Sequence, residues 1–530
     1  MTDQSESGAT PRQLPVLVVG AGPVGLAAAA DLLDKGVAVH CVDAAAGQYP
    51  FTRSLAAWPR MMEILRGLGV ELRDPALGHP LGALHYFSGN RPILTLGLRA
   101  HTRPMVVGQP AIERLLLDGL HARGGAVRWR TRLVELERRP DAVRARFELA
   151  DGGTEWAEYS YVIGADGASS TVRKLLGVPF EGSTYPVGFV LADVRLHGGL
   201  APDQAYYYVS DKGMLALVGM PHGRYRVFTS APPGLDRDNV TLDDVQRLLD
   251  DRGPGGLTMS DPLWLTAFAV HARHAERMRD GRVFLMGDAA HIHSPAGGQG
   301  LNTGIGDAHN LAWKLAMVWH GRAAADLLAS YQPERMAAVA AVVRDADLQT
   351  KAWLVRKRWH RVVRDLAARV VSATRLADLD YVPRLAGLRV RYAAEPGAGG
   401  SRLSPYRPGA LVPNWPVLVD GVRTPLRAAL CRHRFTVLVD GPARGAQLRA
   451  LLDRVARQWS DEVDMRALHG RVLRSGLSSV EGRTARGTRV VLVRPDQHVL
   501  AHAPAARAYD VLSRLESLLP QRDSVSPERE

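Results

Sequence analysis

Residues Gly281–Ala316 read GRVFLMGDAAHIHSPAGGQGLNTGIGDAHNLAWKLA. The short apolar run Val283–Met286 predicts a strand that ends at Gly287-Asp288. Glycines follow, and apolar residues then recur at a helical period up to a stop at His320-Gly321. Glycines allow a flat ligand to approach the backbone closely, and a helix N-terminus offers N–H groups and a partial positive charge. The stretch therefore predicts an anion or cofactor loop without saying which cofactor.

Length and composition bound the class of protein. With 530 residues, the chain is long enough for two to four domains, and a hydrophobic content of 46% supports large cores. No run of about 18 apolar residues occurs, so we expect neither a membrane span nor a membrane partner. The polar residues 1–13 lack an apolar export signal and are expected to be a disordered tail, which favours a cytoplasmic protein. Cys41 and Cys431 form no CxxC, which argues against a disulfide scaffold or a zinc site.

The net charge of +13 has two interpretations. Nucleic-acid binding is one, and basic residues scattered over an ordinary surface are the other. Charges of both signs are mixed along the chain, and the densest basic cluster, Lys351–Arg364, is typical of one face of a surface helix. We therefore expect no nucleic-acid partner, while a positive field would favour an anionic dinucleotide.

A second glycine loop lies near the start of the chain. The apolar run Leu14–Val19 is followed by a GxGxxG motif, an alanine-rich amphipathic stretch and a second apolar run that ends at Asp43. The motif consists of Gly20, Ala21, Gly22, Pro23, Val24 and Gly25. Asp43 stands 23 positions after Gly20, close to the spacing of an acid that binds a ribose. This strand, loop, helix, strand and acid predict a dinucleotide site, but they do not separate FAD from NAD.

Further candidates lie between these two loops. Arg53 and Arg60 are either a pyrophosphate-binding pair or a solvent-exposed pair. Gln109-Pro110 opens a predicted helix. Asp166-Gly167 ends a predicted strand, where the acid is either a turn residue or, beside a dinucleotide, a functional one.

Residues 187–271 change character and predict an inserted antiparallel sheet with one helix over Asp243–Asp251. Its aromatic residues either line a pocket for a flat substrate or simply fill a core. They are Tyr206, Tyr207, Tyr208, Tyr225, Phe228, Trp264 and Phe268. Residues 331–395 are predicted to be largely helical, and Ala394–Ala410 is a glycine- and proline-rich boundary before a separate small α/β unit.

The order of GxGxxG, Asp166-Gly167 and Gly287-Asp288 resembles the single-component FAD-dependent aromatic hydroxylases of the para-hydroxybenzoate hydroxylase type. The resemblance covers roughly Leu14 to Pro504 and is closest to phenol- and polyketide-tailoring hydroxylases with an extra C-terminal domain. It implies an α/β fold with a Rossmann-like FAD-binding domain, an inserted antiparallel-sheet substrate domain and a C-terminal thioredoxin-like domain. The implied limits are 14–186 with 272–395 for the first domain, 187–271 for the second and 396–520 for the third, followed by a tail at 521–530.

The resemblance also implies roles for single residues. Gly20, Gly22 and Gly25 would lie at the FAD pyrophosphate, Asp43 at the adenosine ribose and Asp288 at the ribityl chain. The remaining implied FAD contacts are Arg53, Gln109, Asp166, Gly167, Pro295, Gly298, Gly300, Leu301 and Asn302, and the resemblance implicates Asp166-Gly167 in NAD(P)H binding as well. The sequence departs from the family at Ala56, where a glycine is common, and in the C-terminal unit, which has no CxxC and is expected to serve packing or a homodimer contact.

The implied reaction is the hydroxylation of a phenolic or polyketide aromatic by dioxygen, through a flavin C4a-hydroperoxide, with NADPH or NADH as co-substrate. Baeyer–Villiger oxygen insertion and a non-catalytic FAD-binding role remain as alternatives. No catalytic base is assigned, and the candidates are His85, Arg224, Tyr225 and His271. His291 and His293 form an HxH pair, but a catalytic metal needs a third ligand, so we expect no metal.

Overall fold

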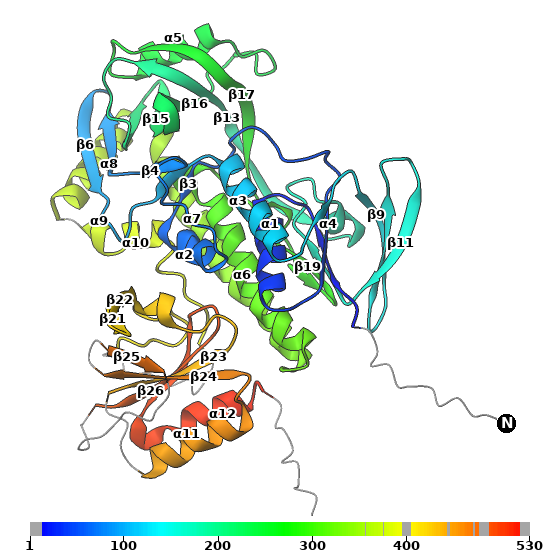
Figure 1. Ribbon diagram of the computed structural model, residues 1–530. Helices are drawn as coiled ribbons and strands as arrows, with labels where there is room; N and C mark the ends of the chain where they lie inside the picture. Colours follow the sequence, from blue (N-terminus) through cyan, green and yellow to red (C-terminus); the bar gives the residue numbers. More distant parts are fainter. Residues whose placement is uncertain are drawn as a thin grey trace, which may run out of the picture.

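The computed structural model describes residues 13–355, 357–374, 376–394, 404–441, 446–469, 472–475 and 487–519 (Figure 1). The predicted tails, apart from Gln13, and most of the predicted boundary at 394–410 lie outside these residues. No helix among the described residues is long and apolar enough to cross a membrane.

The first domain is built on a six-stranded sheet in which five neighbouring strands are parallel. Its strands, in spatial order, are β18 (Arg279–Asp280), β19 (Val283–Leu285), β12 (Tyr161–Gly164), β1 (Val16–Val19), β2 (Val39–Val42) and β8 (Val127–Arg128). β1, β12 and β19 are buried along their whole length, as strands covered on both faces must be. The helices that contact one another beside this sheet are α1 (Pro23–Asp34), α3 (Gln109–Ala122) and α6 (Gly300–Trp319).

Two small sheets and two helices complete this domain. The antiparallel sheet beside β12 contains β9 (Arg132–Arg138), β10 (Val143–Glu148) and β11 (Thr154–Tyr159). The other small sheet contains β3 (Ala56–Ala57), β7 (Met105–Val107) and β4 (Gly78–Pro80). The helices are α2 (Pro59–Gly67) and α4 (Thr171–Leu175).

An eight-stranded sheet forms the second layer of the molecule (Figure 1). Its strands, in spatial order, are β20 (His291–Ile292), β17 (Thr258–Ala275), β13 (Phe180–His197), β16 (Arg224–Ser230), β15 (Gly213–Met220), β14 (Gln204–Ser210), β5 (Ala83–Ser88) and β6 (Arg91–Gly97). The sheet thus extends beyond the predicted segment 187–271, because β13 and β17 are longer than expected and the hairpin β5–β6 pairs in parallel with β14. Sequence periodicity shows the strands but not this distant pairing.

The two faces of this sheet have different partners. α5 (Leu242–Arg252) packs on the outer face, against a cluster that includes Val194, Leu217 and Val227. The inner face contributes Phe189 and Phe228 to a second cluster shared with the helices that follow α6. These helices are α7 (Tyr331–Trp353), α8 (Arg358–Thr374), α9 (Leu376–Leu379) and α10 (Tyr381–Leu385).

The C-terminal domain has a seven-stranded mixed sheet. Its strands are β22 (Val422–Pro425), β21 (Pro416–Val419), β25 (Val472–Ser475), β24 (Val463–His469), β23 (Phe435–Asp440), β26 (Arg489–Val493) and β27 (Val499–Pro504), with helices α11 (Ala446–Gln458) and α12 (Tyr509–Glu516). Trp313 of α6 packs edge-on against Phe435 of β23, with ring centroids 5.7 Å apart, so α6 belongs to the cores of both domains. This order of elements confirms the predicted fold class.

Candidate functional site

The atoms that a Cβ would meet at each glycine show why the GxGxxG loop needs these residues. A Cβ at Gly20 would lie 2.4 Å from the carbonyl oxygen of Ala165, and one at Gly25 would lie 1.8 Å from the carbonyl oxygen of Gly20. A Cβ at Gly22 would meet nothing within 4 Å. Gly20 and Gly25 are therefore required by packing, whereas Gly22 borders open space at the N-terminus of α1, where no side chain caps the helix.

Asp43 follows β2 and lies beside this loop. Its carboxylate accepts hydrogen bonds from the backbone N–H groups of Ala21 and Ala45, each at 2.7 Å. The predicted acid and the glycine loop are thus brought together at the carboxyl end of the parallel strands, the edge where α/β sheets bind ligands.

The loop after β19 meets the first loop through α1 and α6. A Cβ at Gly304 of α6 would lie 2.6 Å from the Val24 side chain and 3.2 Å from the Cα of Gly287, so these two helices approach closely. Asp288 emerges beside this contact with an exposed side chain. Protein atoms nevertheless crowd its carboxyl, and this desolvation raises its pKa against the opposing influence of His291 and Arg53.

A buried ion-pair network, missed by the sequence analysis, holds this loop in place. Asp307 of α6 is fully buried and accepts from the Gly287 N–H at 3.0 Å, the His291 Nε2 at 2.7 Å and the Arg335 Nε at 2.7 Å. Arg335 of α7 lies beside Gly306, where a Cβ would stand 2.9 Å from the guanidinium. The sequence holds one signal for this network: Asp307 and Arg335 are an acid and a base 28 positions apart, on two helices that are expected to pack together.

The loop 295–302 is tied to the segment before α2. Asn302 accepts from the Trp58 N–H at 2.8 Å and donates to the carbonyls of Ala56 and Gly298 at 2.9 and 2.8 Å. Pro295 is exposed, Leu301 is half-buried, and a Cβ at Gly300 would meet nothing within 4 Å. Since no side chain caps α6, its N-terminal N–H groups also face an open region.

The Asp166-Gly167 turn packs against the first glycine loop, but its carboxylate is used locally. Asp166 accepts from the Ser170 hydroxyl at 2.6 Å and from the N–H groups of Thr171 and Val172 at 2.7 and 3.1 Å. Arg173 extends from this helix to the carbonyl of Ala289, at 2.8 Å, and so reaches the loop that contains Asp288. Asp166 thus helps Ser170 to cap the start of α4, and its predicted contact with a cofactor stays a prediction.

The two arginines considered as a pair have different surroundings. Arg53 is exposed and stacks over Tyr49, 4.4 Å from the ring centroid. Arg60 is buried and donates to the Gln497 side chain at 2.6 Å and to the Asp496 carbonyl at 2.8 Å, both in the C-terminal domain. Neither predicted role for Arg60 is correct, because it joins two domains.

Two other side chains hold the Arg53 loop. Gln109 accepts from the Ser54 N–H at 3.1 Å and donates to Glu113 at 2.8 Å. Arg226 of β16, buried and paired with Asp193 at 2.8 Å, donates to the carbonyls of Thr52 and Arg53. The Arg226–Asp193 pair, also missed by the sequence analysis, therefore connects the eight-stranded sheet to the glycine-loop region.

The four candidate bases are not brought together. Each engages a different neighbour: His85 with Tyr206, Tyr225 with Leu200, Arg224 with Asp261 and His271 with Thr184. His85 lies on the face opposite Tyr86, which belongs to the inner cluster.

The aromatic side chains of the sheet divide between its faces. Those that pack into the inner cluster are Tyr86, Tyr185, Phe189, Tyr207, Phe228, Trp264 and Phe268. Tyr86 and Tyr207 stack with centroids 4.8 Å apart, and Tyr207 stacks on Trp353 of α7. Gln349 of α7 donates to the Tyr86 hydroxyl at 3.1 Å, and its Oε1 lies 3.5 Å from where a Cβ of Gly297 would be. The inner aromatic face therefore adjoins the loop 295–302.

The HxH pair is occupied by other contacts. His291 bonds Asp307, and His293 Nδ1 lies 2.9 Å from the Ser294 carbonyl. No group of three metal-ligating side chains gathers within the part of the chain that the structure describes. Burial lowers the pKa of His293 to about 4, with a smaller contribution in the same direction from His291.

His293 should make the unfolding free energy depend on pH. Because its pKa is about 4 in the folded state and 6.5 in the unfolded chain, the unfolded state binds more protons between these values. The stability that neutral His293 contributes is thus fully present above pH 6.5 and is lost progressively toward pH 4. Urea denaturation at pH 6.5 and at pH 4 measures how much the free energy of unfolding falls between these values. The fall should be smaller by about 1–3 kcal/mol in His293→Gln than in the wild type. Exposed His101→Gln is the control, and an equal drop in all three proteins would contradict the assignment.

Comparison with known proteins agrees with this geometry. The family model for the FAD binding domain matches residues 13–346, and the model for the C-terminal domain of aromatic-ring hydroxylases matches residues 406–520. The 6-methylpretetramide 4-monooxygenase of Streptomyces rimosus is 30% identical over 531 residues, which covers 95% of this chain and 93% of that protein.

Solved structures extend the similarity to nearly the whole chain. An anhydrotetracycline hydroxylase from Streptomyces rimosus superposes with a TM-score of 0.77 at 29% identity, covering 96% of this chain and 100% of that one. Aklavinone-11 hydroxylase, in a ternary complex with FAD and aklavinone, gives a TM-score of 0.75 at 27% identity, with coverage of 96% and 99%. This chain belongs to the family of FAD-dependent aromatic-ring hydroxylases.

Proposed function

We propose that this monooxygenase hydroxylates a phenolic or polyketide aromatic, with NADPH or NADH as reductant and dioxygen as co-substrate. The observation that carries the proposal is the convergence of three features: two uncapped helix N-termini, an exposed acid at Asp288 and an inner aromatic sheet face beside the loop 295–302. The relatives described above are named for oxygenation of fused-ring polyketides, which supports this substrate class.

The residues present fit FAD. The open space at Gly22 and the N-terminus of α1 suit the pyrophosphate, and Asp43 stands where the adenosine ribose would follow. Asp288 would bind hydroxyls of the ribityl chain. Gly300 leaves room for a flat ring, and the N–H groups that start α6 would stabilise negative charge on it. Bound FAD supplies the capacity to take a hydride and to activate dioxygen.

The surrounding chain would orient the substrate and exclude water. The inner aromatic cluster provides an apolar wall, with Tyr86 and Gln349 as polar groups near Gly297. Burial raises the pKa of Tyr86 well above its usual value, so this phenol stays protonated at neutral pH. A neutral Tyr86 would position an oxygen of the substrate rather than remove its proton.

Product analysis tests the function. Purified protein with FAD, phenolic polyketides and either NADH or NADPH should yield a product heavier by one oxygen atom, together with substrate-stimulated oxidation of the nicotinamide. A ring-expanded lactone product would favour Baeyer–Villiger insertion, and FAD binding without turnover of any aromatic would favour a non-catalytic role. Sedimentation of the same sample tests the expected homodimer.

Asp288→Ala should weaken FAD binding by roughly 10–100-fold, because a hydrogen bond to a charged group contributes about 1.5–3 kcal/mol. Flavin fluorescence titration measures this change, and the C-terminal domain should remain folded. Asp288→Asn, which keeps one acceptor, should lose less. Unchanged affinity in Asp288→Ala would contradict the assignment to the ribityl chain.

A further inference from the structure

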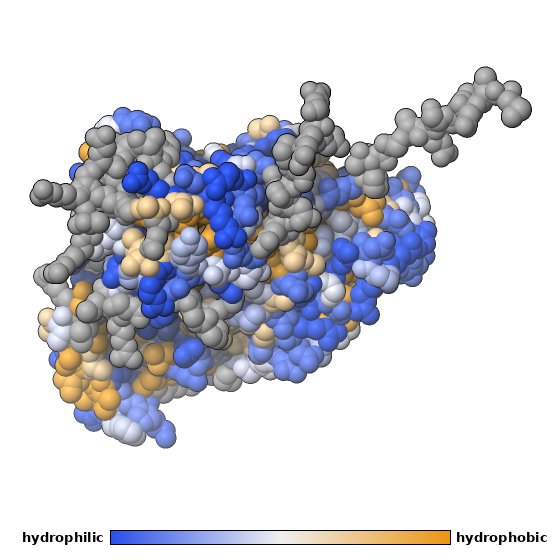
Figure 2. Space-filling model, turned by 90° about the horizontal axis from the view of Figure 1, so that it is seen from below, coloured by the Kyte–Doolittle hydropathy of each residue, from blue (hydrophilic) through white to orange (hydrophobic). Residues whose placement is uncertain are grey.

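Helix α8 exposes an apolar face that no described residue covers. Its five large apolar side chains are spaced along one side of the helix: Trp359 (64% exposed), Val362 (61%), Val363 (58%), Leu366 (63%) and Val370 (52%). Intervals of three and four residues place them in a single stripe. Figure 2 shows a hydrophobic cluster at its lower left, the side on which Figure 1 places α8 and α9. Contiguous exposed apolar surface of this kind marks an interaction site.

The stripe is not the core-facing side of the helix. Ala368 and Val371 of α8 already pack against the inner cluster of the eight-stranded sheet. Arg364 fixes the rotation of the helix, because it donates to the Ser88 hydroxyl at 3.0 Å and to the Ala352 carbonyl at 3.3 Å. Turning the stripe inward would break these contacts, so none of the described residues serves as its partner.

Charge indicates what kind of partner fits. α8 carries four arginines against the single acid Asp365, a net charge of +3, and exposed Lys357 precedes it. Arg358 and Arg369 are exposed near its two ends, and Arg361 reaches Asp211 at 3.1 Å. An α8 from a second copy would oppose one cationic helix with another, which is unfavourable. Arginines beside a stripe of tryptophan, leucine and valine instead suit a helix that lies in the surface of an anionic bilayer.

We propose that α8 docks this enzyme onto an anionic lipid membrane. The outer stripe enters the boundary between headgroups and acyl chains, and the exposed arginines contact lipid phosphates. This is surface attachment, distinct from a membrane span, and it differs from the sequence expectation of no membrane partner.

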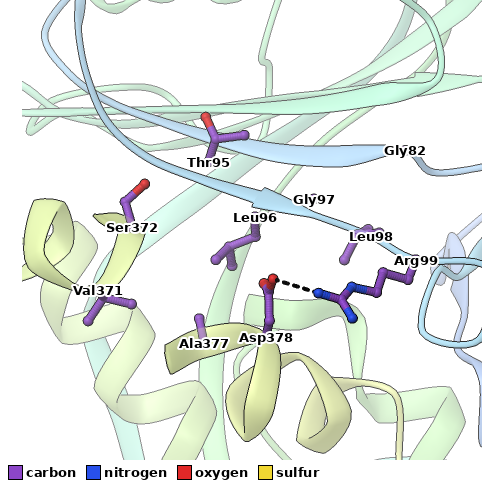
Figure 3. A pocket seen from close by; sticks show the side chains of 10 residues that line it. All are labelled: Gly82, Thr95, Leu96, Gly97, Leu98, Arg99, Val371, Ser372, Ala377 and Asp378. Carbon is purple, nitrogen blue, oxygen red and sulfur yellow. Dashed lines mark ion pairs between the residues drawn. The ribbon is translucent and has the colours of Figure 1, made fainter. Parts of the chain in front are cut away.

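A pocket lies on the inner side of α8, on the side of the helix opposite the exposed stripe (Figure 3). The pocket, of about 530 Å³, lies between β6 and α8–α9, away from the glycine loops. Its walls include Leu96 of β6, Leu98 just after that strand and Val371 of α8, with the Arg99–Asp378 pair, 3.6 Å apart, at its side.

Vesicle co-sedimentation tests the docking without using activity. The full-length protein should bind vesicles of phosphatidylcholine with about one third phosphatidylglycerol at about 0.1 M NaCl, and far less at about 0.5 M NaCl or on pure phosphatidylcholine. Val362→Glu/Leu366→Glu should lower the partition coefficient about tenfold or more, and Arg358→Gln/Arg369→Gln roughly tenfold. Val422→Glu/Leu263→Glu is the matched control, since these residues are 65% and 56% exposed but lie outside α8. It should bind like the wild type.

Fluorescence adds a local readout. Vesicles should shift the tryptophan emission of the wild type to the blue, and Trp359→Phe should abolish that shift. Vesicle binding that is absent, or equal in the α8 and control variants, would overturn the proposal. A dimer in sedimentation that only the α8 variants convert to monomer would overturn it in favour of a second copy of the chain. If the wild type binds vesicles as expected but hydroxylates no aromatic compound, the result counts against the proposed function alone.

Discussion

Asp307→Ala is expected to lower the free energy of unfolding by about 3–5 kcal/mol, because it leaves a buried charge without its partner. Arg335 is 3% exposed and His291 is 2% exposed, so water cannot replace the lost carboxylate. The Gly287 N–H would lose its acceptor at the same time. Urea denaturation of the FAD-free protein measures the effect, and flavin titration should show that the loop around Asp288 binds less tightly.

Two further variants serve as comparisons for Asp307→Ala. Asp307→Asn keeps an oxygen acceptor but removes the charge, and it should cost less than the alanine variant. Asp141→Ala removes an exposed acid and should change stability by no more than about 0.5 kcal/mol. If Asp307→Ala proved as stable as Asp141→Ala, the network would not hold the loop as described.

The GxGxxG loop allows a sharper separation of folding from cofactor binding. Gly25→Ala should destabilise the FAD-free protein by roughly 1–3 kcal/mol, because its Cβ would overlap the Gly20 carbonyl oxygen at 1.8 Å. Gly22→Ala should change stability by less than about 1 kcal/mol, since its φ of −69° suits alanine and its Cβ meets open space. The same variant should weaken FAD binding at least about tenfold, because that space is proposed to hold the pyrophosphate.

Denaturation and flavin titration of both variants give the comparison. Gly89→Ala is not a suitable control, because the φ of Gly89 is +57°. Gly47, which also meets open space and has no positive φ, is suitable, and Gly47→Ala should alter neither quantity. If Gly22→Ala bound FAD with wild-type affinity, the assignment of the pyrophosphate to this loop would be wrong.

Much of the site follows from short-range sequence signals. The loops around Gly20 and Gly287 were predictable because a strand, a glycine turn and a helix are adjacent in the chain, and each element has its own periodicity. The fold class was predictable for the same reason, together with the resemblance. The pairing of β5 with β14 was not, because parallel pairing between segments more than 100 positions apart leaves no local pattern.

Arg60 and Asp166 show the limits of motif reading. Both stand in plausible positions for a ligand. Arg60 instead bonds the C-terminal domain, whereas Asp166 bonds the first N–H groups of α4 and its cofactor contact stays a prediction. A motif gives the type and spacing of its residues, whereas a side chain's partner depends on which segments meet it in space.

The amino-acid sequence alone specifies the cofactor-binding framework of this protein, because glycine positions, strand ends and helix starts are local properties of the chain. The tertiary structure specifies what holds that framework together: Asp307 with Arg335, and Arg226 with the Arg53 loop. It also separates the inner aromatic face from the outer one, and within the described residues it leaves the stripe on α8 uncovered. These features arise from contacts between distant segments, whose energies depend on burial and mutual distance and not on order in the sequence.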